Sequence, residues 1–280
     1  MKKRGVAALM PLYITTICLV LLPMLYVLAL SFLTRGERFG VIGVVTLDNY
    51  ARLFDATNVS IVLRSMWIAL LTTAITLAAG YPFAYALTVQ PKKRRALLLV
   101  LVIVPFWTSA LLRIYGLMIL LRSNGLLNQL LMALGLMDKP IKFLFNEDAV
   151  LFGMVYSFLP FMILPIYTTL DKADHSLLEA SRDLGAGPVK GFLTVTLPLS
   201  MPGVVSGCMM VFVPSIGMFF ISDLMGGGTD MLLGNLINHY LLGGRNWPLG
   251  AALSMVLVVM TVLTVSVYRK FSGGSTLEVL

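Results

Sequence analysis

Long apolar segments separated by shorter polar ones extend along almost the whole chain. A helix needs about 20 predominantly apolar residues to cross the hydrocarbon core of a bilayer. Six segments reach that length, at approximately 7–33, 66–89, 96–121, 149–170, 197–222 and 249–268. The pattern therefore predicts an all-α integral membrane protein, with six transmembrane helices in a single domain that covers residues 1–280.

The composition supports this class. Hydrophobic residues make up 58% of the chain and charged residues only 12%, about half the charged share of a typical soluble domain. The net charge is +8, but the basic residues fall in short runs beside apolar segments, such as MKKR and PKKRR. That placement is typical of residues that set membrane topology, so we expect contact with membrane lipid and no nucleic-acid partner. Cys18 and Cys208 lie in apolar segments and indicate neither a disulfide nor a metal site.

The distribution of Lys and Arg predicts an orientation. If the N-terminus is cytoplasmic, the inner segments are approximately 1–6, 90–95, 171–196 and 269–280. Basic residues are then roughly two- to threefold denser inside than in the longer outer loops, as the positive-inside rule requires. The first span follows Lys2, Lys3 and Arg4 like a secretory signal, but its apolar run is longer and no clear cleavage site follows. We therefore expect a retained anchor, and both termini in the cytoplasm.

Proline and glycine are frequent within the predicted spans. Backbone groups freed by a kink must find partners on neighbouring helices or in a water-filled cavity. Two interpretations stay open: ordinary helix packing through small residues, or kinked helices around a translocation path. The fifth span favours the second, because repeated breaks are expected in PLSMPGVVSGCMMVFVPSIGMFF.

A polar segment between the fourth and fifth spans, SLLEASRDLGAG at 176–187, predicts a short helix in a cytoplasmic loop. Ser176 is a good N-cap residue, and Glu179 three residues later completes a capping box. Gly185 suits the left-handed position just past a helix end, and the Gly187–Pro188 pair prevents continuation. The predicted helix is therefore about two turns long.

One face of this helix is more apolar than the rest. The residues on that face are Leu177, Leu178, Ser181 and Leu184. A helix this short is not stable alone in water, so the membrane surface, the rest of the chain or a partner protein must hold it. Two interpretations follow: Glu179 only caps and the leucines only lie on the bundle, or the helix docks a cytoplasmic partner.

The same segment resembles a motif of a known family, the EAA motif of ABC importer permeases of the binding-protein-dependent type. In EASRDLGAGPVKGFLTVTLP, the residues at the expected spacing are Glu179, Ala180, Ser181, Gly185, Val195, Leu197 and Pro198, with Ser181 and Val195 as mild departures. The resemblance extends along nearly the whole chain, through LDNYARLF, GYPFAYAL, IVPFWTSALLRIYGL, LPFMILPIY, LLEASRDLGA, LPLSMPG and SDLMGG. These segments look like those of spermidine/putrescine permease subunits.

The resemblance implies a type I ABC importer permease with a MetI-like fold, in a bacterial inner membrane, with a coupling helix at approximately 176–187. It also implies a complex with a second related permease subunit, two copies of an ATPase and a periplasmic substrate-binding protein. The implied function is a pore-forming subunit that moves polyamines into the cytoplasm by alternating access. The residues expected to dock the ATPase are Ser176, Leu177, Leu178, Glu179, Ala180, Ser181, Leu184 and Gly185.

The sequence contains no phosphate-binding loop of the form GxxxxGK[ST]. GAGPVKG lacks the spacing and the Ser/Thr, and GGGTD lacks the lysine. We therefore expect a chain that is not an enzyme and binds no cofactor, with ATP and Mg²⁺ on the partner ATPase.

A polyamine is a flexible polycation, so its path should offer carboxylates and aromatic faces. Asp223, expected at the outer end of the fifth span, could attract a cation, although aspartates at span ends often only face water. Trp107, after a kink expected at Pro105, could offer a cation–π contact, although interfacial aromatics are often only anchors. The further aromatic candidates for this path are Tyr115 in the third span, Tyr156 and Tyr167 in the fourth, and Tyr50 in the first outer loop.

Arg113 would repel a polyamine from the pore, so we expect it to snorkel outward or to pair with a carboxylate such as Asp223. His175 and His239 are isolated in the sequence, and we expect surface histidines rather than ligands.

Three other functions are alternatives to a polyamine permease. The first is a permease of the same family for another small cationic or amine solute. The second is an ion-coupled secondary transporter, but the sequence has no convincing internal repeat and only Asp223 as an embedded carboxylate. The third is a membrane enzyme, which no metal cluster or nucleophile–base pair in the sequence supports.

Overall fold

The structure, a computed structural model, describes residues 10, 14–36, 40–228 and 231–271, without the side chains of His175, Arg269 and Phe271. Lys2, Lys3 and Arg4, the start of the span predicted at 7–33 and most of the segment 269–280 lie outside the described residues. The chain forms two compact units where the sequence predicts one domain. We call them the flanking unit, from 1–63 and 233–261, and the central unit, from 64–232 and 262–280.

The flanking unit is helical, with one short antiparallel β-hairpin. The predicted helical fold class is therefore confirmed apart from this hairpin. Its elements are η1 (Ile17–Leu21), α2 (Leu22–Ser31), β1 (Leu33–Arg35), β2 (Val41–Val45), α3 (Asp48–Leu53), the start of α4 (Ala56–Thr88), α13 (Leu233–Asn238), η4 (His239–Gly243) and the start of α14 (Trp247–Phe271).

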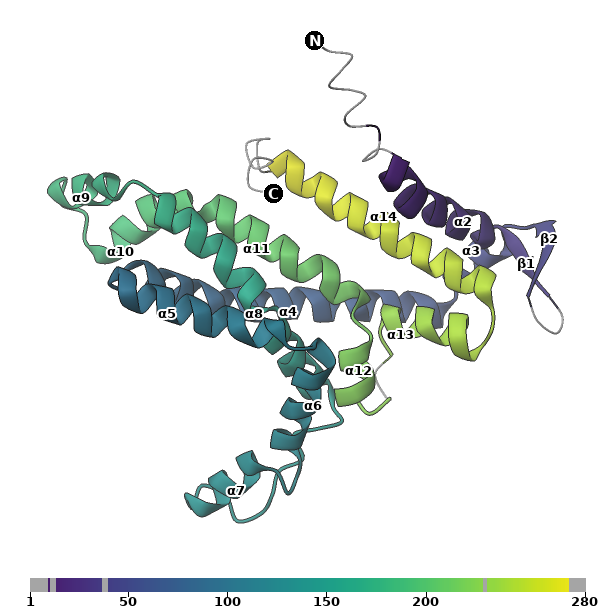
Figure 1. The fold of residues 1–280 in the computed structure, drawn as a ribbon, viewed down its shortest axis with the longest axis horizontal. Coiled ribbons are helices and arrows are strands. Elements are labelled where there is room, and N and C mark those ends of the chain that lie inside the picture. The colour runs from purple at the N-terminus through teal and green to yellow at the C-terminus, as the bar shows by residue number, and fades with distance from the viewer. Residues whose placement is uncertain (1–9, 11–13, 37–39, 229–230, 272–280) are drawn as a thin grey trace, which may run out of the picture. The chain divides into compact units, whose positions relative to one another are not determined.

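The central unit contains the main helical core (Figure 1). Its elements, besides the remainder of α4 and α14, are α5 (Lys92–Ile103), η2 (Val104–Trp107), α6 (Ala110–Leu121), α7 (Leu126–Ala133), α8 (Glu147–Lys172), α9 (His175–Asp183), α10 (Pro188–Gly191), η3 (Phe192–Thr196), α11 (Leu197–Gly217) and α12 (Phe220–Met225). Within this unit, α8 and α11 lie side by side, with α9 at one end of the pair and α12 at the other.

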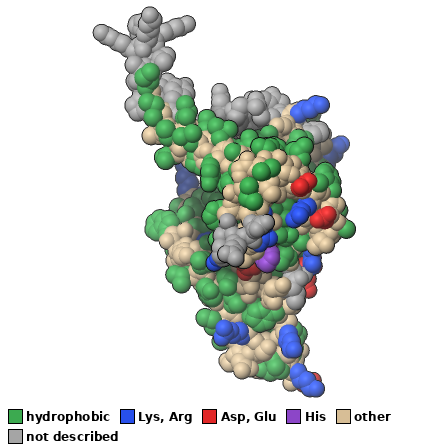
Figure 2. All heavy atoms as spheres, turned by 90° about the vertical axis from the view of Figure 1, so that its right-hand side faces the viewer, with side chains coloured by type: hydrophobic (Ala, Val, Ile, Leu, Met, Phe, Trp, Pro, Cys, Tyr) green, Lys and Arg blue, Asp and Glu red, His purple; other side chains and the backbone are tan. Residues whose placement is uncertain are grey.

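Six helical segments among the described residues are long and apolar enough to cross a membrane, which confirms the predicted number. They are Ile14–Ser31, Ala56–Thr88, Ala110–Ala133, Glu147–Lys172, Pro188–Gly217 and Trp247–Tyr268. The second and fifth begin earlier than the sequence predicts. Figure 2 shows that hydrophobic side chains cover much of the face it presents, while charged side chains gather in small groups. That surface is expected of a protein whose surroundings are lipid rather than water.

The third span is not the single helix predicted at 96–121. Pro105 lies in the 3₁₀ turn η2, which follows α5, and the backbone at Thr108 is extended with ψ 156° before α6 begins. The kink expected at Pro105 is therefore confirmed, and it is sharp enough to separate two helices. A second break follows at residues 122–125, where Arg122 and Gly125 are extended, so α6 and α7 are also distinct.

Prolines explain two of the π-helical turns. The turn η1 ends two residues before Pro23, and η3 ends two residues before Pro198. A proline ring clashes with the carbonyl group four residues earlier in an α-helix, and a π turn widens the helix at that point. By contrast, α11 is continuous through Pro202 and Pro214, so the repeated breaks expected within the fifth span are wrong. The helix ends only at Gly217, because Met218 is extended.

The contact between α8 and α11 depends on two glycines of α11. A Cβ atom at Gly203 would lie 2.5 Å from Thr169 Oγ1 and 2.6 Å from the Pro165 carbonyl oxygen. A Cβ atom at Gly207 would lie 2.8 Å from Met162 Sδ. Glycine therefore lets the two backbones approach closely, as small residues do between membrane helices.

We predict that Gly203→Ala destabilises the protein, because the added methyl group meets backbone that cannot move away. Overpacking of this kind costs about 1–3 kcal/mol, which thermal unfolding in detergent would detect as a lower midpoint. Gly116→Ala on α6 is the matched control, since a Cβ atom there meets nothing within 4 Å. An equal loss in both variants would contradict the proposed close contact.

Candidate functional site

The short helix predicted at 176–187 is present as α9, although it begins and ends earlier, at His175 and Asp183. Its N-cap is Asp174, whose carboxylate accepts a hydrogen bond from the backbone N–H of Ser176 at 2.9 Å. The predicted capping box of Ser176 and Glu179 is therefore wrong, because Ser176 already lies inside the helix. Aspartate caps as well as serine does, and Asp174 comes first in the chain.

The C-terminal end of α9 follows the prediction for Gly185. This glycine has a φ of +81°, a conformation that costs other residues free energy. Its N–H donates to the Arg182 carbonyl at 2.9 Å, and the N–H of Ala186 donates to the Ser181 carbonyl at 3.0 Å. These two bonds form a Schellman motif, which ends the helix sharply.

The apolar face predicted for this helix is divided in the structure. Leu178 and Ser181 are half-buried and pack against α10, where a Cβ atom at Gly191 would lie 3.5 Å from Leu178 Cδ1 and 3.4 Å from Ser181 Oγ. Leu177 is exposed, and Leu184 is 89% exposed. The remaining predicted docking residues are exposed as well: Ser176, Glu179, Ala180 and Gly185. One side of α9 thus rests on its own chain and the other is open.

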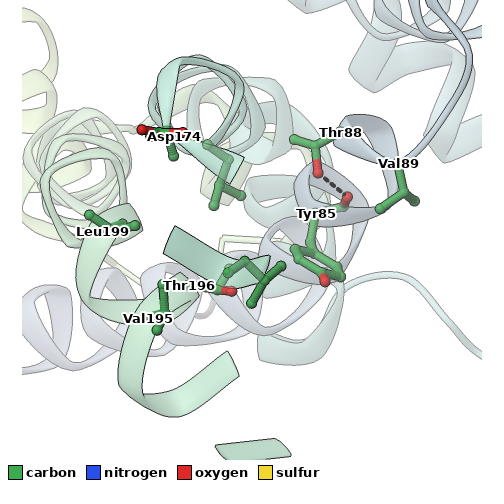
Figure 3. A pocket seen from close by; sticks show the side chains of 10 residues that line it. Tyr85, Thr88, Val89, Asp174, Val195, Thr196 and Leu199 are labelled. Atoms are coloured by element: carbon green, nitrogen blue, oxygen red, sulfur yellow. Dashed lines mark hydrogen bonds between the residues drawn. The ribbon is translucent and has the colours of Figure 1, made fainter. Parts of the chain in front are cut away.

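A small pocket of ≈ 70 Å³ lies behind α9 (Figure 3). Residues from the end of α4 form one side of it, and η3 with the start of α11 forms another. The lining residues are Tyr85, Thr88, Val89, Leu170, Ala173, Asp174, Leu178, Val195, Thr196 and Leu199. The Thr88 hydroxyl donates to the Tyr85 carbonyl at 2.8 Å, so it does not bond across the pocket. Packing beneath α9 is therefore incomplete.

An ion pair ties α5 to α8 near α9. The guanidinium of Arg95 contacts the carboxylate of Asp171 and donates to the Tyr167 hydroxyl at 3.4 Å. Both partners lie in the last turns of α8, just before the chain enters α9. This pair was not predicted from the sequence. Opposite charges at the ends of two neighbouring spans are a signal from which an ion pair could have been predicted. A second pair, Arg64 with Glu147 at 2.6 Å, ties α4 to the other end of α8.

The residues predicted for a substrate path are mostly accessible. Trp107 on η2, Tyr115 on α6 and Tyr156 on α8 have exposed side chains. Tyr167 is half-buried, and its hydroxyl accepts a hydrogen bond from the Arg95 guanidinium. That positive charge would repel a polyamine. Tyr50 belongs to the flanking unit, where its hydroxyl lies 2.7 Å from Ser31 Oγ and its ring packs on Phe32.

Two charged residues lie in surroundings that differ from the prediction. Asp223 is exposed but lies on the separate helix α12, because α11 ends at Gly217. Arg113 reaches no carboxylate among the described residues, so the expected pairing with a residue such as Asp223 is not found. Its guanidinium stacks on Phe106, with Cζ 4.0 Å from the ring centroid, and donates to the Pro105 carbonyl at 3.2 Å. The turn at η2 brings both partners within reach, while Nε of Arg113 is buried without a hydrogen-bond partner in the described part of the chain.

Metal ligands do not gather in the described part of the chain. No group of three or more His, Cys, Asp or Glu side chains there could hold a metal ion. His239 packs its ring on Tyr240. The site is therefore built from the α9 helix, its pocket and the neighbouring ion pair.

We predict that Asp174→Ala frays α9, because it removes the N-cap that the structure identifies. Loss of such a cap costs about 0.5–2 kcal/mol of helix stability, which hydrogen exchange of the amides of α9 would report as faster exchange. Ser176→Ala is the matched control and should leave that exchange nearly unchanged. Equally fast exchange in the two variants would show that Ser176 contributes to the cap, as the predicted capping box requires.

Comparison with known proteins places this geometry in a family. A family model described as "Binding-protein-dependent transport system inner membrane component" matches residues 77–272. The chain is 47% identical over 253 residues to the spermidine/putrescine transport system permease protein PotB of Escherichia coli (strain K12), covering 90% of this chain and 92% of that protein. It is 46% identical to the protein of the same name from Haemophilus influenzae, covering 90% and 88%.

Solved structures show the same fold. The structure of a bacterial alginate ABC transporter in complex with an alginate pentasaccharide-bound periplasmic protein matches with a TM-score of 0.78, at 16% identity, over 97% of this chain and 94% of that one. The permease fold implied by the EAA-like motif is thereby confirmed. The chain belongs to the family of binding-protein-dependent transport system inner membrane components.

Proposed function

We propose that this chain is the pore-forming permease subunit of an ATP-driven importer that carries spermidine or putrescine into the cytoplasm. The substrate class is supported by the relatives that are 46–47% identical over 90% of the chain and are named for spermidine/putrescine transport. The mechanism is supported above all by α9, a nine-residue helix that buries one side on its own chain and leaves the other open.

The exposed side of α9 is suited to a cytoplasmic ATPase. Leu177 and Leu184 offer apolar contacts, and Glu179 offers a charge between them. A helix of this length is marginal by itself, so a partner that covers the exposed leucines would stabilise it. The ATPase would supply the ATP and Mg²⁺ chemistry, and this chain would bind neither.

The connections of α9 suit it to transmit motion. It joins α8 directly to the helix that begins at α10, and these two long helices are locked together at Gly203 and Gly207. Closure of an ATPase dimer would push on α9, and the push would reach both helices together. The pocket behind α9 leaves room for that displacement, while the contact of Arg95 with Asp171 keeps α5 attached to the end that moves.

The orientation in this proposal follows from basic residues. The contact of Arg95 with Asp171 puts the run Lys92–Arg95 at the same end of the central unit as α9. Four consecutive basic residues favour the cytoplasmic side. In this arrangement both termini are cytoplasmic, in a bacterial inner membrane. The further partners would be a second related permease subunit and a periplasmic binding protein that delivers the polyamine.

The proposed substrate path uses the exposed candidates of the central unit. Asp223 would attract the arriving polycation, and Trp107, Tyr115 and Tyr156 would offer aromatic faces that bind cations weakly enough to release them. Tyr167 is a poorer candidate, because its hydroxyl already faces Arg95. Tyr50 would serve only if the flanking unit borders the path.

We predict that Glu179→Lys abolishes uptake while insertion into the membrane stays normal. A reversed charge in a docked interface costs about 2–5 kcal/mol, so uptake of labelled spermidine by cells should fall at least about tenfold. Copurification of the ATPase should fall with it. Asp138→Lys is the control, another exposed acid, in the segment between α7 and α8. Normal uptake by Glu179→Lys would count against docking through α9.

We predict that Asp223→Asn raises the KM for spermidine uptake about fivefold, since it removes one charge attraction of about 1 kcal/mol. The maximal rate should change less, because the carboxylate acts on arrival. Asp138→Asn, a loss of the same charge elsewhere, should leave the KM unchanged. Equal KM values in all three proteins would remove Asp223 from the path.

A further inference from the structure

Helix α7 exposes a stripe of leucines and buries a polar residue. Its fully buried residue is Asn128, with 0% exposure, while Leu126 and Leu130 are 54% and 51% exposed. Leu134, which follows the helix, is 71% exposed. These leucines recur every four residues and so form one stripe. Leu127 and Leu131 on another side of the helix are half-buried, and Leu127 packs on the core. The helix therefore presents leucines outward as well as inward.

Asn128 uses its buried amide to hold two loop segments in place. Its Nδ2 donates to the Arg122 carbonyl at 3.1 Å and to the Ile141 carbonyl at 3.0 Å. Its Oδ1 accepts from the N–H of Ile141 at 2.9 Å. The chain just before α7 is thereby tied to the chain well after it, and the two segments form a fixed framework rather than a loose loop.

A hollow of ≈ 770 Å³ opens beside this framework. Its lining residues are Leu121, Arg122, Ser123, Asn124, Lys142, Leu144 and Phe145. Arg122 and Lys142 are its charged residues, both exposed, and no carboxylate lines it. A cationic hollow would repel a polyamine, so the substrate of the proposed transport does not belong there.

The position of this hollow relative to the spans favours a lipid. It lies where α6 ends at Leu121 and shortly before the long apolar helix α8 begins at Glu147, so it is at one end of α8. At that depth phospholipid phosphate groups and the upper parts of acyl chains are both present. An anionic phospholipid complements both features, the two cations with its phosphate group and the leucine stripe with its acyl chains.

We propose that this end of the protein is a binding site for an anionic phospholipid. Arg122 and Lys142 bind the phosphate of the headgroup, and the stripe of Leu126, Leu130 and Leu134 lies against acyl chains in the same leaflet. Helix α7 then has lipid on one side and the two loop segments held by Asn128 on the other. This proposal does not depend on the substrate or on docking at α9.

The first test measures lipid retention by native mass spectrometry. The full-length chain, purified with its associated subunits, is released from nanodiscs that contain phosphatidylcholine alone or with phosphatidylglycerol. Each basic residue near an anionic headgroup contributes about 1 kcal/mol, so Arg122→Gln or Lys142→Gln should lower phosphatidylglycerol binding about fivefold, and the double variant about thirtyfold. Lys139→Gln, an exposed cation in the same loop that does not line the hollow, is the matched control.

The second test does not depend on the charge variants. A bimane label on Leu130→Cys, in a chain that carries Cys18→Ser and Cys208→Ser, should be quenched by nitroxide-bearing lipids and protected from aqueous iodide. A label at Gln129, which is exposed on another side of the helix, should show more quenching by iodide.

Two outcomes would overturn the proposal. Phosphatidylglycerol binding that is equal in the double variant, Lys139→Gln and the unmodified chain would remove Arg122 and Lys142 from any lipid site. Protection of the label at position 130 from both quenchers would show that a protein partner, not lipid, covers α7. Strong quenching by iodide at position 130 would show that the stripe faces water.

Discussion

The close backbone contact between α8 and α11 is the constraint on which the rest of the central unit depends. Gly203 and Gly207 allow it, because a side chain at either position would meet α8 at less than ordinary contact distance. The chain that joins these two helices carries α9 and α10, so the contact also sets where α9 emerges. A displacement of α9 would therefore act on two locked helices together.

Contacts with its own chain stabilise α9 only on one side, and its other side is exposed. Asp174 caps one end, the turn at Gly185 closes the other, and Leu178 anchors the middle. These contacts define the fold of the helix, but the pocket behind it and the exposed Leu184 leave apolar surface unburied. Elements that must move in a transport cycle are drawn from the less stable parts of a structure. The sparse packing of α9 fits that requirement.

Features set by local chemistry could be predicted from the sequence, and features set by tertiary contacts could not. The six apolar segments, the existence of α9 and the left-handed Gly185 follow from length, periodicity and glycine geometry. The choice of Asp174 over Ser176 as the cap could not be decided, because both are good caps two residues apart. The contact of Arg113 with Phe106 could not be predicted, since it exists only after η2 folds the chain back. The pairing of Arg95 with Asp171 joins residues far apart in the chain, and the candidate path residues carry no local signal of their surroundings.

The π turn at Phe192–Thr196 has a consequence for the rotational phase of everything after it. Such a turn accommodates one residue more than an α-helical turn does, and one residue corresponds to about 100° around the helix axis. Gly203 and Gly207, which contact α8, lie after this turn, so their angular positions around the helix axis include the displacement. The side of α11 that packs on α8 is therefore displaced by about one residue from the periodicity that α10 begins.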